Sequence, residues 1–447
     1  MFDLGKVEAS AALDPAVILS AQRTLSAALE APSGLDDAGR LDAVRALERL
    51  ECVVTAAQAH LAAEHAEARR EEHAALGLTR ARRGQGVAHE IAWARRESPH
   101  RGQRHVGLAA IIGPELPATW EAWKRGYIGE QQATWIARET ACLTRPDRLA
   151  VDALVAGDPE ALAERGLREL VSQVQAEAAR IDPASVVARR RRAEADRHVT
   201  LRPAPDTMTW LSALLPVKDG VAAYAALTRA ADGARAAGDP RSRGAVMADA
   251  LVGRVVAGQA AEADPTPVSL GLVMSDRDLF GADDEPAFIE GFGPIPAELA
   301  REIVVGAVTA REQVWLRRLY SRPDTGELVA MEGRGRLFRG ALARFVRLRD
   351  QVCRTPWCDA PVRHLDHAVD HCRTGPTSGR NAQGLCEGCS YAKQAPGWRA
   401  RPSPDTAGAA HEVETRLPTG HHYLSRPPRV VATVRRTTVR IDYALTG

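Results

Sequence analysis

Two pairs of cysteines constrain this chain more tightly than any other feature. Cys353 and Cys358 form the first pair, and Cys386 and Cys389 form the second. Thiolates suit Zn²⁺, and four of them around one ion form a closed tetrahedral structural site. Such an ion ties two distant turns together and stabilises a segment that is too small to fold on its core alone. The spacing predicts structural Zn²⁺ in a small domain. The alternative is four reduced thiols without a metal.

The cysteine content also indicates a compartment. The chain has 447 residues and seven cysteines, and five of the seven fall between Cys353 and Cys389. An odd, clustered set makes a poor disulfide framework, whereas it suits metal binding in a reducing environment. We see neither a secretory leader nor an uninterrupted apolar run long enough to span a membrane. The sequence therefore predicts a cytoplasmic protein without a membrane segment.

Apolar periodicity predicts the fold class. From about residue 41, apolar side chains recur at steps of three and four residues, as in an amphipathic helix: Leu41, Val44, Leu47, Leu50 and Val54. Similar patterns, ended by Pro or Gly, continue for about two hundred residues. Alternation near 268–275 instead predicts a short strand. We therefore expect a mainly α N-terminal domain followed by a small α+β domain stapled by zinc.

The expected domain organisation has five parts. They are an N-terminal segment at 1–34, a helical domain at 35–319, a basic linker and helix at 320–344, the cysteine-bearing domain at 345–400, and an extended tail at 401–447. The end of the tail, "RVVATVRRTTVRIDYAL", alternates in a way that indicates an exposed strand or a frayed end.

Local clustering of arginine suggests a polyanionic partner. The formal charge is only +2, so affinity for nucleic acid must come from a local patch. Arginines outnumber acids strongly between residues 334 and 354. DNA is the expected partner, through salt-sensitive contacts to its phosphate backbone. A solvated helix face is the alternative. The candidate contacts are Arg344, Arg347, Arg349, Arg354, Arg373, Arg380 and Lys393.

A motif between the cysteine pairs resembles a known family. Asp366 and His367 are adjacent, Asn381 follows fourteen residues after His367, and "LCEGCSYAK" runs from 385 to 393. This pattern resembles the HNH endonuclease motif of the ββα-metal fold. The resemblance implies that His367 ends a strand, that Asn381 lies in the connecting segment, and that the last ligand opens a helix. A second pair, Asp370 and His371, is interpreted as polar residues of the loop.

The resemblance extends beyond that motif. "GVAHEIAWARRESP", "PDTMTWLSALLP", "RSRGAVMADAL", "GFGPIPAELAR" and "PTGHHYLS" are similar to segments of the actinobacterial 13E12-repeat group. That group joins a helical domain of unknown function to a C-terminal HNH module. The similarity covers about residues 35 to 425.

The resemblance implies a metal-dependent endonuclease that hydrolyses phosphodiester bonds of DNA and leaves 5′-phosphate and 3′-hydroxyl ends. Water is a weak nucleophile, so a general base is needed to take its proton. The phosphate gains charge in the transition state, and a divalent cation stabilises that charge. His367 is the candidate base. Asp366 is a hard oxygen ligand that suits catalytic Mg²⁺ or Mn²⁺. By analogy with the family, Asn381 orients the base and holds the loop.

One position departs from the family pattern. Ser390 stands nine residues after Asn381, where the family normally carries His or Asn as a second metal ligand. A hydroxyl is a weaker ligand, although Ser and Thr bind Mg²⁺ in P-loops. The alternative function is therefore a weakened or inactive zinc module that binds nucleic acid, with the helical domain as an interaction scaffold. Asp366 and His367 would then be a structural pair.

Overall fold

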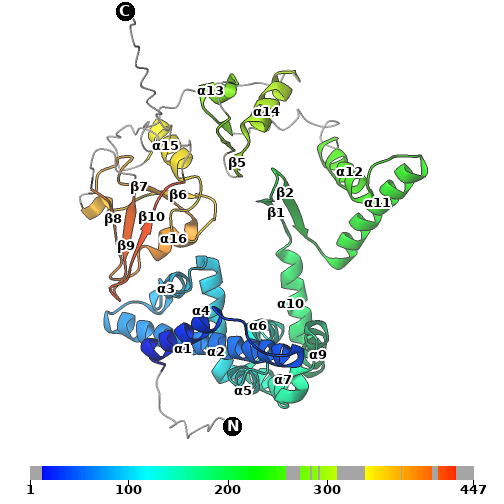
Figure 1. Cartoon of the computed structure of the whole chain (residues 1–447), viewed down its shortest axis with the longest axis vertical. Coiled ribbons are helices and arrows are strands. Elements are labelled where there is room, and N and C mark those ends of the chain that lie inside the picture. The colour runs from blue at the N-terminus through cyan, green and yellow to red at the C-terminus, as the bar shows by residue number, and fades with distance from the viewer. Residues whose placement is uncertain are drawn as a thin grey trace, which may run out of the picture. The chain divides into compact units, whose positions relative to one another are not determined.

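The structure is a computed structural model that describes residues 13–257, 272–281, 284–289, 292–309, 338–373, 375–404 and 411–428. It divides into two compact units, Met1–Arg190 and Arg191–Gly447. Figure 1 shows the helices and strands along the chain. A mainly helical N-terminal region is followed by small antiparallel sheets and a cluster of four cysteines, which confirms the predicted fold class. None of the described helices is both long and apolar enough to span a bilayer.

The first unit is built from helices. They are α1 (Pro15–Ala28), α2 (Asp37–Ala75), α3 (Val87–Ala94), α4 (Pro99–Glu115), α5 (Pro117–Lys124), α6 (Glu130–Glu139), α7 (Arg145–Ala156), α8 (Pro159–Ala163), α9 (Leu167–Ile181) and α10 (Pro183–Ala195), with a 3₁₀ turn η1 (Arg80–Arg82). The last helix crosses the boundary between the units. Side-chain caps start several of them: Asp36 caps α2, Ser98 caps α4 and Thr144 caps α7.

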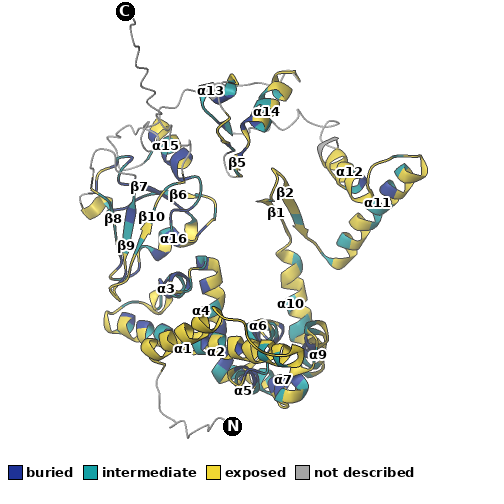
Figure 2. Cartoon of the chain, in the orientation of Figure 1, coloured by how far each residue is buried: buried dark blue, intermediate teal, exposed yellow. Residues whose placement is uncertain are grey.

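One apolar core holds this unit together. It contains the fully buried side chains of Leu116, Trp123 and Ile136, with further residues from α2, α4, α7 and α9. Helices α3 and α4 approach so closely that a Cβ atom at Gly102 would lie 1.9 Å from the carbonyl oxygen of Ala88. Helix α1 contributes no buried residue, and Figure 2 shows it exposed along its length.

The second unit begins with two hairpins. Strands β1 (His198–Pro203) and β2 (Thr209–Leu214) pair antiparallel, and every residue of β1 is exposed (Figure 2). Helices α11 (Val217–Ala236) and α12 (Arg243–Ala257) pack against each other. A three-stranded sheet follows, made of β3 (Leu272–Val273), β4 (Ala287–Ile289) and β5 (Gly293–Ile295), with α13 (Asp276–Leu279) and α14 (Ala297–Thr309). Strand β3 falls within the predicted β-prone segment, whose first residues, 268–271, lie outside the described residues.

The cysteine-bearing region closes the unit. It consists of α15 (Gly340–Asp350), β6 (His364–His367), η2 (His371–Arg373), β7 (Ala382–Leu385), α16 (Glu387–Ala392), β8 (Arg399–Pro402), β9 (Val413–Arg416) and β10 (His422–Ser425). Strands β6 and β7 form an antiparallel hairpin, and β10, β9 and β8 form a three-stranded sheet in that order. Most of the predicted linker, residues 320–337, and the tail from residue 429 lie outside the described residues.

Candidate metal centre and the adjoining polar site

The four predicted zinc ligands converge on one point. The Sγ atoms of Cys358 and Cys386 are 3.9 Å apart, and those of Cys358 and Cys389 are 3.7 Å apart. All four sulfurs, including that of Cys353, lie within 4.8 Å of one another. Four sulfurs at about 2.3 Å from a tetrahedral zinc ion would lie about 3.8 Å apart. The donor set and its spacing therefore fit structural Zn²⁺.

Two local turns present these sulfurs. Cys353 and Cys358 lie in the loop after α15, whereas Cys386 caps the N-terminus of α16 and Cys389 lies in its first turn. Hydrogen bonds from the Cys353, Cys358 and Cys389 thiols lower the pKa of the Cys386 thiol, and the backbone N–H of Cys389 points at the same sulfur from 3.4 Å. The thiolate is the form that binds a metal.

His367 ends strand β6, as the motif predicts, and lies inside the domain. The residue is only 8% exposed, and its Nε2 atom is 2.9 Å from the hydroxyl oxygen of Thr377. The ring of Phe338 lies 4.6 Å away between centroids. The imidazole is therefore held in one orientation by a hydroxyl and an aromatic ring.

Asn381 braces the loop between β6 and β7. Its side-chain oxygen accepts a hydrogen bond from the Val369 N–H at 2.9 Å, and its amide nitrogen donates to the carbonyl oxygens of Val369 and Pro376 at 3.0 and 2.9 Å. The loop folds so tightly that a Cβ atom at Gly375 would lie 1.9 Å from the Val369 oxygen. The side chain holds the loop; its predicted part in orienting the base stays a prediction.

Asp366 is paired with a lysine. The ammonium group of Lys393 lies 2.8 Å from the carboxylates of both Asp366 and Asp370, and it also donates to the backbone carbonyl of His367. Lys393 follows directly after α16, and Ser390 lies one turn earlier on that helix. The structure thus brings Asp366 and Lys393 together. Asp370, interpreted from the sequence as a polar residue of the loop, lies at the same ammonium group of Lys393.

The arginines predicted to contact nucleic acid differ in burial. Arg344, Arg347 and Arg373 are exposed. Arg380 is half-buried and donates to the carbonyl oxygens of Ser403 and Pro404. Arg349 and Arg354 are 3% and 4% exposed, so their guanidinium groups lie in the interior rather than on a surface that a phosphate backbone could reach.

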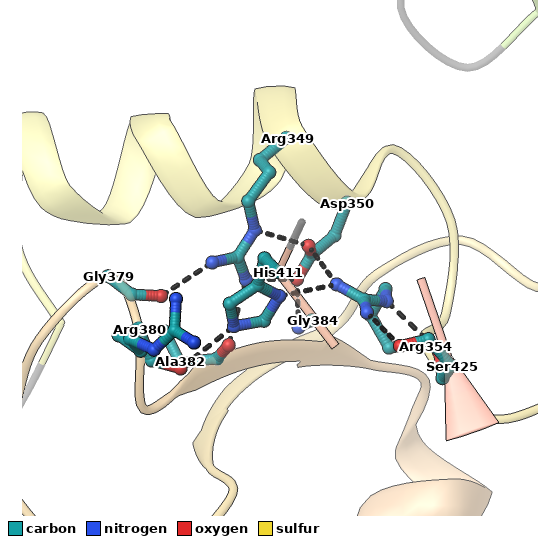
Figure 3. Close-up of polar contacts among 9 residues, drawn as sticks. All are labelled: Arg349, Asp350, Arg354, Gly379, Arg380, Ala382, Gly384, His411 and Ser425. Atoms are coloured by element: carbon teal, nitrogen blue, oxygen red, sulfur yellow. Dashed lines mark hydrogen bonds and ion pairs between the residues drawn. The ribbon is translucent and has the colours of Figure 1, made fainter. Parts of the chain in front are cut away.

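The two buried arginines share one carboxylate, that of Asp350 at the end of α15 (Figure 3). It accepts hydrogen bonds from Arg349 Nε at 2.7 Å, from Arg354 Nη1 at 2.9 Å and from the backbone N–H of Gly384 at 2.6 Å. Burial alone would raise the pKa of Asp350, but the charges and hydrogen bonds of Arg349 and Arg354 outweigh it and lower the pKa. The remaining donors of Arg354 bind Ser425.

His411 completes this network (Figure 3). Its Nδ1 atom is 3.2 Å from Arg354 Nη1 and its Nε2 atom is 2.8 Å from the carbonyl oxygen of Arg380. Because a guanidinium can only donate and a carbonyl can only accept, the proton of the neutral ring sits on Nε2. Burial, together with the charges of Arg349 and Arg354, lowers the pKa of His411 to about 3.

Comparison with known proteins places most of the chain in one family. A family profile described as "Domain of unknown function (DUF222)" matches residues 41–350. The chain belongs to the DUF222 family. The DUF222 match ends at Asp350, so all four cysteines and the polar site around His367 lie beyond it. No solved structure matches the chain significantly.

Curated relatives of this DUF222 chain come from Mycobacterium tuberculosis. The chain is 31% identical over 145 residues to uncharacterized protein Rv3776 of strain H37Rv, which is 32% of this chain and 24% of that protein. It is 30% identical over 141 residues to uncharacterized protein Rv2100 of the same strain, 31% of this chain and 22% of that protein. The matched stretch therefore spans about a quarter of each relative.

Sequence reasoning did not single out three residues of the DUF222 chain's polar site: Gly375, Thr377 and, as a charged partner, Asp370. Gly375 and Thr377 belong to the turn-rich segment "GPTSG", and such a turn directly before Asn381 is the signal that could have found them. The pairing of Asp370 with Lys393 had no comparable signal, because the two residues are joined only through the packing of α16 beside β6.

Proposed function

We propose that the cysteine-bearing region is an HNH-type module that hydrolyses phosphodiester bonds of DNA. The observation that carries the proposal is the position of Asp366 and His367 at the end of β6, in a hairpin followed by α16 and tied to it by the cysteine cluster. This order of two strands and a helix is the one that the HNH resemblance implies. DUF222 membership adds no known chemistry to it.

The chain's own residues can perform the acid–base part of the reaction. His367 takes the proton of the attacking water as general base, and Thr377 fixes its ring. Asn381 keeps the loop beside it closed. Exposed Arg344 and Arg347, three residues apart on α15, would contact backbone phosphates.

A divalent cation would be held by Asp366 and Ser390 and would neutralise charge on the phosphate. A carboxylate and a hydroxyl are suitable hard donors. The fit is incomplete, however, because the Lys393 ammonium already pairs with Asp366 and Asp370. A cation at Asp366 must therefore compete with a resident positive charge.

That ion pair favours a second candidate function, in which the zinc module binds nucleic acid without cutting it. The Lys393 ammonium then replaces the cation permanently, and Ser390 marks the lost ligand. Asp366 and His367 become structural residues of the hairpin.

One assay separates the two candidates. Supercoiled plasmid is incubated with the full chain in Mg²⁺, Mn²⁺ or Ni²⁺, beside His367→Ala and the matched control His364→Ala, an exposed histidine on the same strand. The nuclease proposal expects metal-dependent nicking that His367→Ala reduces at least about a hundredfold, the lower end of a general base's contribution, and that His364→Ala leaves intact. Cleavage that survives His367→Ala would contradict the proposed site.

Two further variants test the metal ligands. Ser390→Asn supplies the missing donor and Lys393→Met removes the competing charge, so each is expected to increase nicking at low Mn²⁺. Absence of nicking in all variants with every metal, together with salt-sensitive gel shifts, would support the binding module instead.

A further inference from the structure

A cleft of about 590 Å³ lies beside the cysteine cluster, on the side of β10. Residues 352–359, the loop that carries the first cysteine pair, form one wall, and residues 422–426 form the other. The volume falls within the range of pockets that hold small organic groups. The cleft lies outside the group of side chains around His367, and the proposed hydrolysis makes no use of it.

The wall of the cleft carries a tryptophan on unusual backbone. Trp357 has a φ of +57°, in the left-handed region that bulky side chains rarely adopt. The residue is 42% exposed, and its ring meets that of Tyr423 edge-on with centroids 6.0 Å apart. A glycine would adopt this conformation without strain. A strained backbone that leaves much of an indole exposed points to a function for the indole, because the strain costs stability.

Polar groups of both signs surround the aromatic pair. His422 and Arg426 lie exposed on the β10 side, where the Arg426 guanidinium also pairs with Glu412, and Asp359 lies exposed on the opposite wall. The buried pair of Arg354 and Asp350 also lines the cleft. These groups are complementary to a nucleotide. The aromatic rings can stack on the flat base, the cation can contact the phosphate, and the carboxylate can accept a hydrogen bond from an amino group of the base.

We infer that this cleft binds one unpaired base of single-stranded nucleic acid. The base stacks on Trp357, His422 and Arg426 face its phosphate, and Asp359 accepts a hydrogen bond from an exocyclic amino group. In a duplex the faces of the bases are covered by their neighbours, so stacking on a side chain selects single strands or flipped bases. An amino group as donor to Asp359 favours cytosine over thymine.

The test is a binding measurement that does not depend on cleavage. Fluorescence anisotropy of a labelled oligodeoxycytidine is recorded with the zinc-loaded full chain in buffer without added Mg²⁺ or Mn²⁺. Trp357→Gly is expected to weaken binding about tenfold to a hundredfold, the usual cost of losing one base stack. Its melting temperature should stay close to that of the parent chain, because relief of the positive φ offsets the loss of the edge-on contact with Tyr423. Trp357→Phe should restore most of the affinity.

Three comparisons make the result specific. Trp210→Ala, which removes another exposed tryptophan, should bind like the parent chain. Asp359→Asn should reduce the preference for oligodeoxycytidine over oligodeoxythymidine. His364→Ala, at an exposed histidine outside the cleft, should leave binding unchanged. Because the buffer contains no added Mg²⁺ or Mn²⁺, the measurement does not depend on cleavage, and a failure of the proposed hydrolysis is distinguishable from a failure here. Equal affinities of the parent chain and Trp357→Gly, or tighter binding of a duplex or of a proline-rich peptide through Trp357, overturn the inference.

Discussion

His411 is a histidine that the fold keeps neutral. It lies between the Arg354 guanidinium and the carbonyl oxygen of Arg380, and burial and the two neighbouring arginines lower its pKa to about 3. In the unfolded chain its pKa returns to about 6.5. Below pH 6.5 His411 binds a proton in the unfolded state but stays neutral in the folded state. Acid therefore favours unfolding.

The pH dependence of stability should therefore contain a contribution from His411. The stability that the neutral His411 ring contributes is fully present above about pH 6.5 and is lost as the pH falls toward about 3. By pH 5 the loss is about 2 kcal/mol. Urea unfolding measured from pH 7.5 to pH 4 should show a shallower decline in His411→Gln than in the parent chain.

An exposed histidine gives the control for that experiment. His422→Gln should follow the parent curve, because His422 lies at the surface. Parallel curves for His411→Gln and the parent chain would mean that His411 does not resist protonation in the folded state.

Among structural elements, α15 is anchored through its last residue. Asp350 binds Arg349 beside it, Arg354 in the cysteine loop and the backbone of β7 at Gly384. Arg354 in turn reaches Ser425 on β10. This buried network of Asp350, Arg349 and Arg354 thus ties a helix, a loop and strands of two sheets together.

Removing that carboxylate should be costly. Asp350→Ala leaves two buried guanidinium groups without their counter-ion, which is expected to lower the free energy of unfolding by about 3–5 kcal/mol. Asp42→Ala, which breaks a surface ion pair with Arg45, should change it by less than about 1 kcal/mol. Thermal unfolding followed by circular dichroism measures both, and equal effects of the two variants would contradict the role given to Asp350.

The two cysteine turns form a second tie between elements. Cys389→Ser is expected to remove bound zinc and to unfold the hairpin β6–β7 and α16, because the segment has only a small apolar cluster of its own. Cys372→Ser is the matched control, since that exposed thiol lies in η2 outside the cluster. Elemental analysis and hydrogen exchange would report the outcome. Full zinc content in Cys389→Ser would exclude the four-cysteine site.

At the scale of the whole molecule, the helical unit carries its own core. The buried residues of that core all lie between Cys52 and Ala178, within the first compact unit. The second unit instead contains several small clusters, each shared by a few elements. Stability is therefore distributed unevenly along the chain.

A fragment of residues 1–196, which retains α10 complete, should fold by itself. We expect a cooperative thermal transition and helical circular dichroism that are insensitive to chelators, because no residue of the cysteine cluster lies in it. In the full chain, EDTA should lower only the transition of the second unit. A fragment without a cooperative transition would show that the helices need the rest of the chain.

The features that could be predicted from the sequence are those that depend on residues close together in the chain. Helix periodicity and cysteine spacing are encoded within a few residues, so the fold class and the convergence of four sulfurs were predicted correctly. The position of His367 at a strand end followed from the motif. The domain boundaries and the roles of the site residues stay predictions.

The chain's sequence by itself determined which segments are helical and which side chains can hold zinc, because turns and helices depend on neighbouring residues. Only the tertiary structure decided what the charged residues do. The sequence predicted that Arg349 and Arg354 would contact nucleic acid, but both lie buried against Asp350. Lys393, predicted to do the same, is paired with Asp366 and Asp370. A buried charge is stable only when it is paired, and the partner that folding supplies can be far away in the chain.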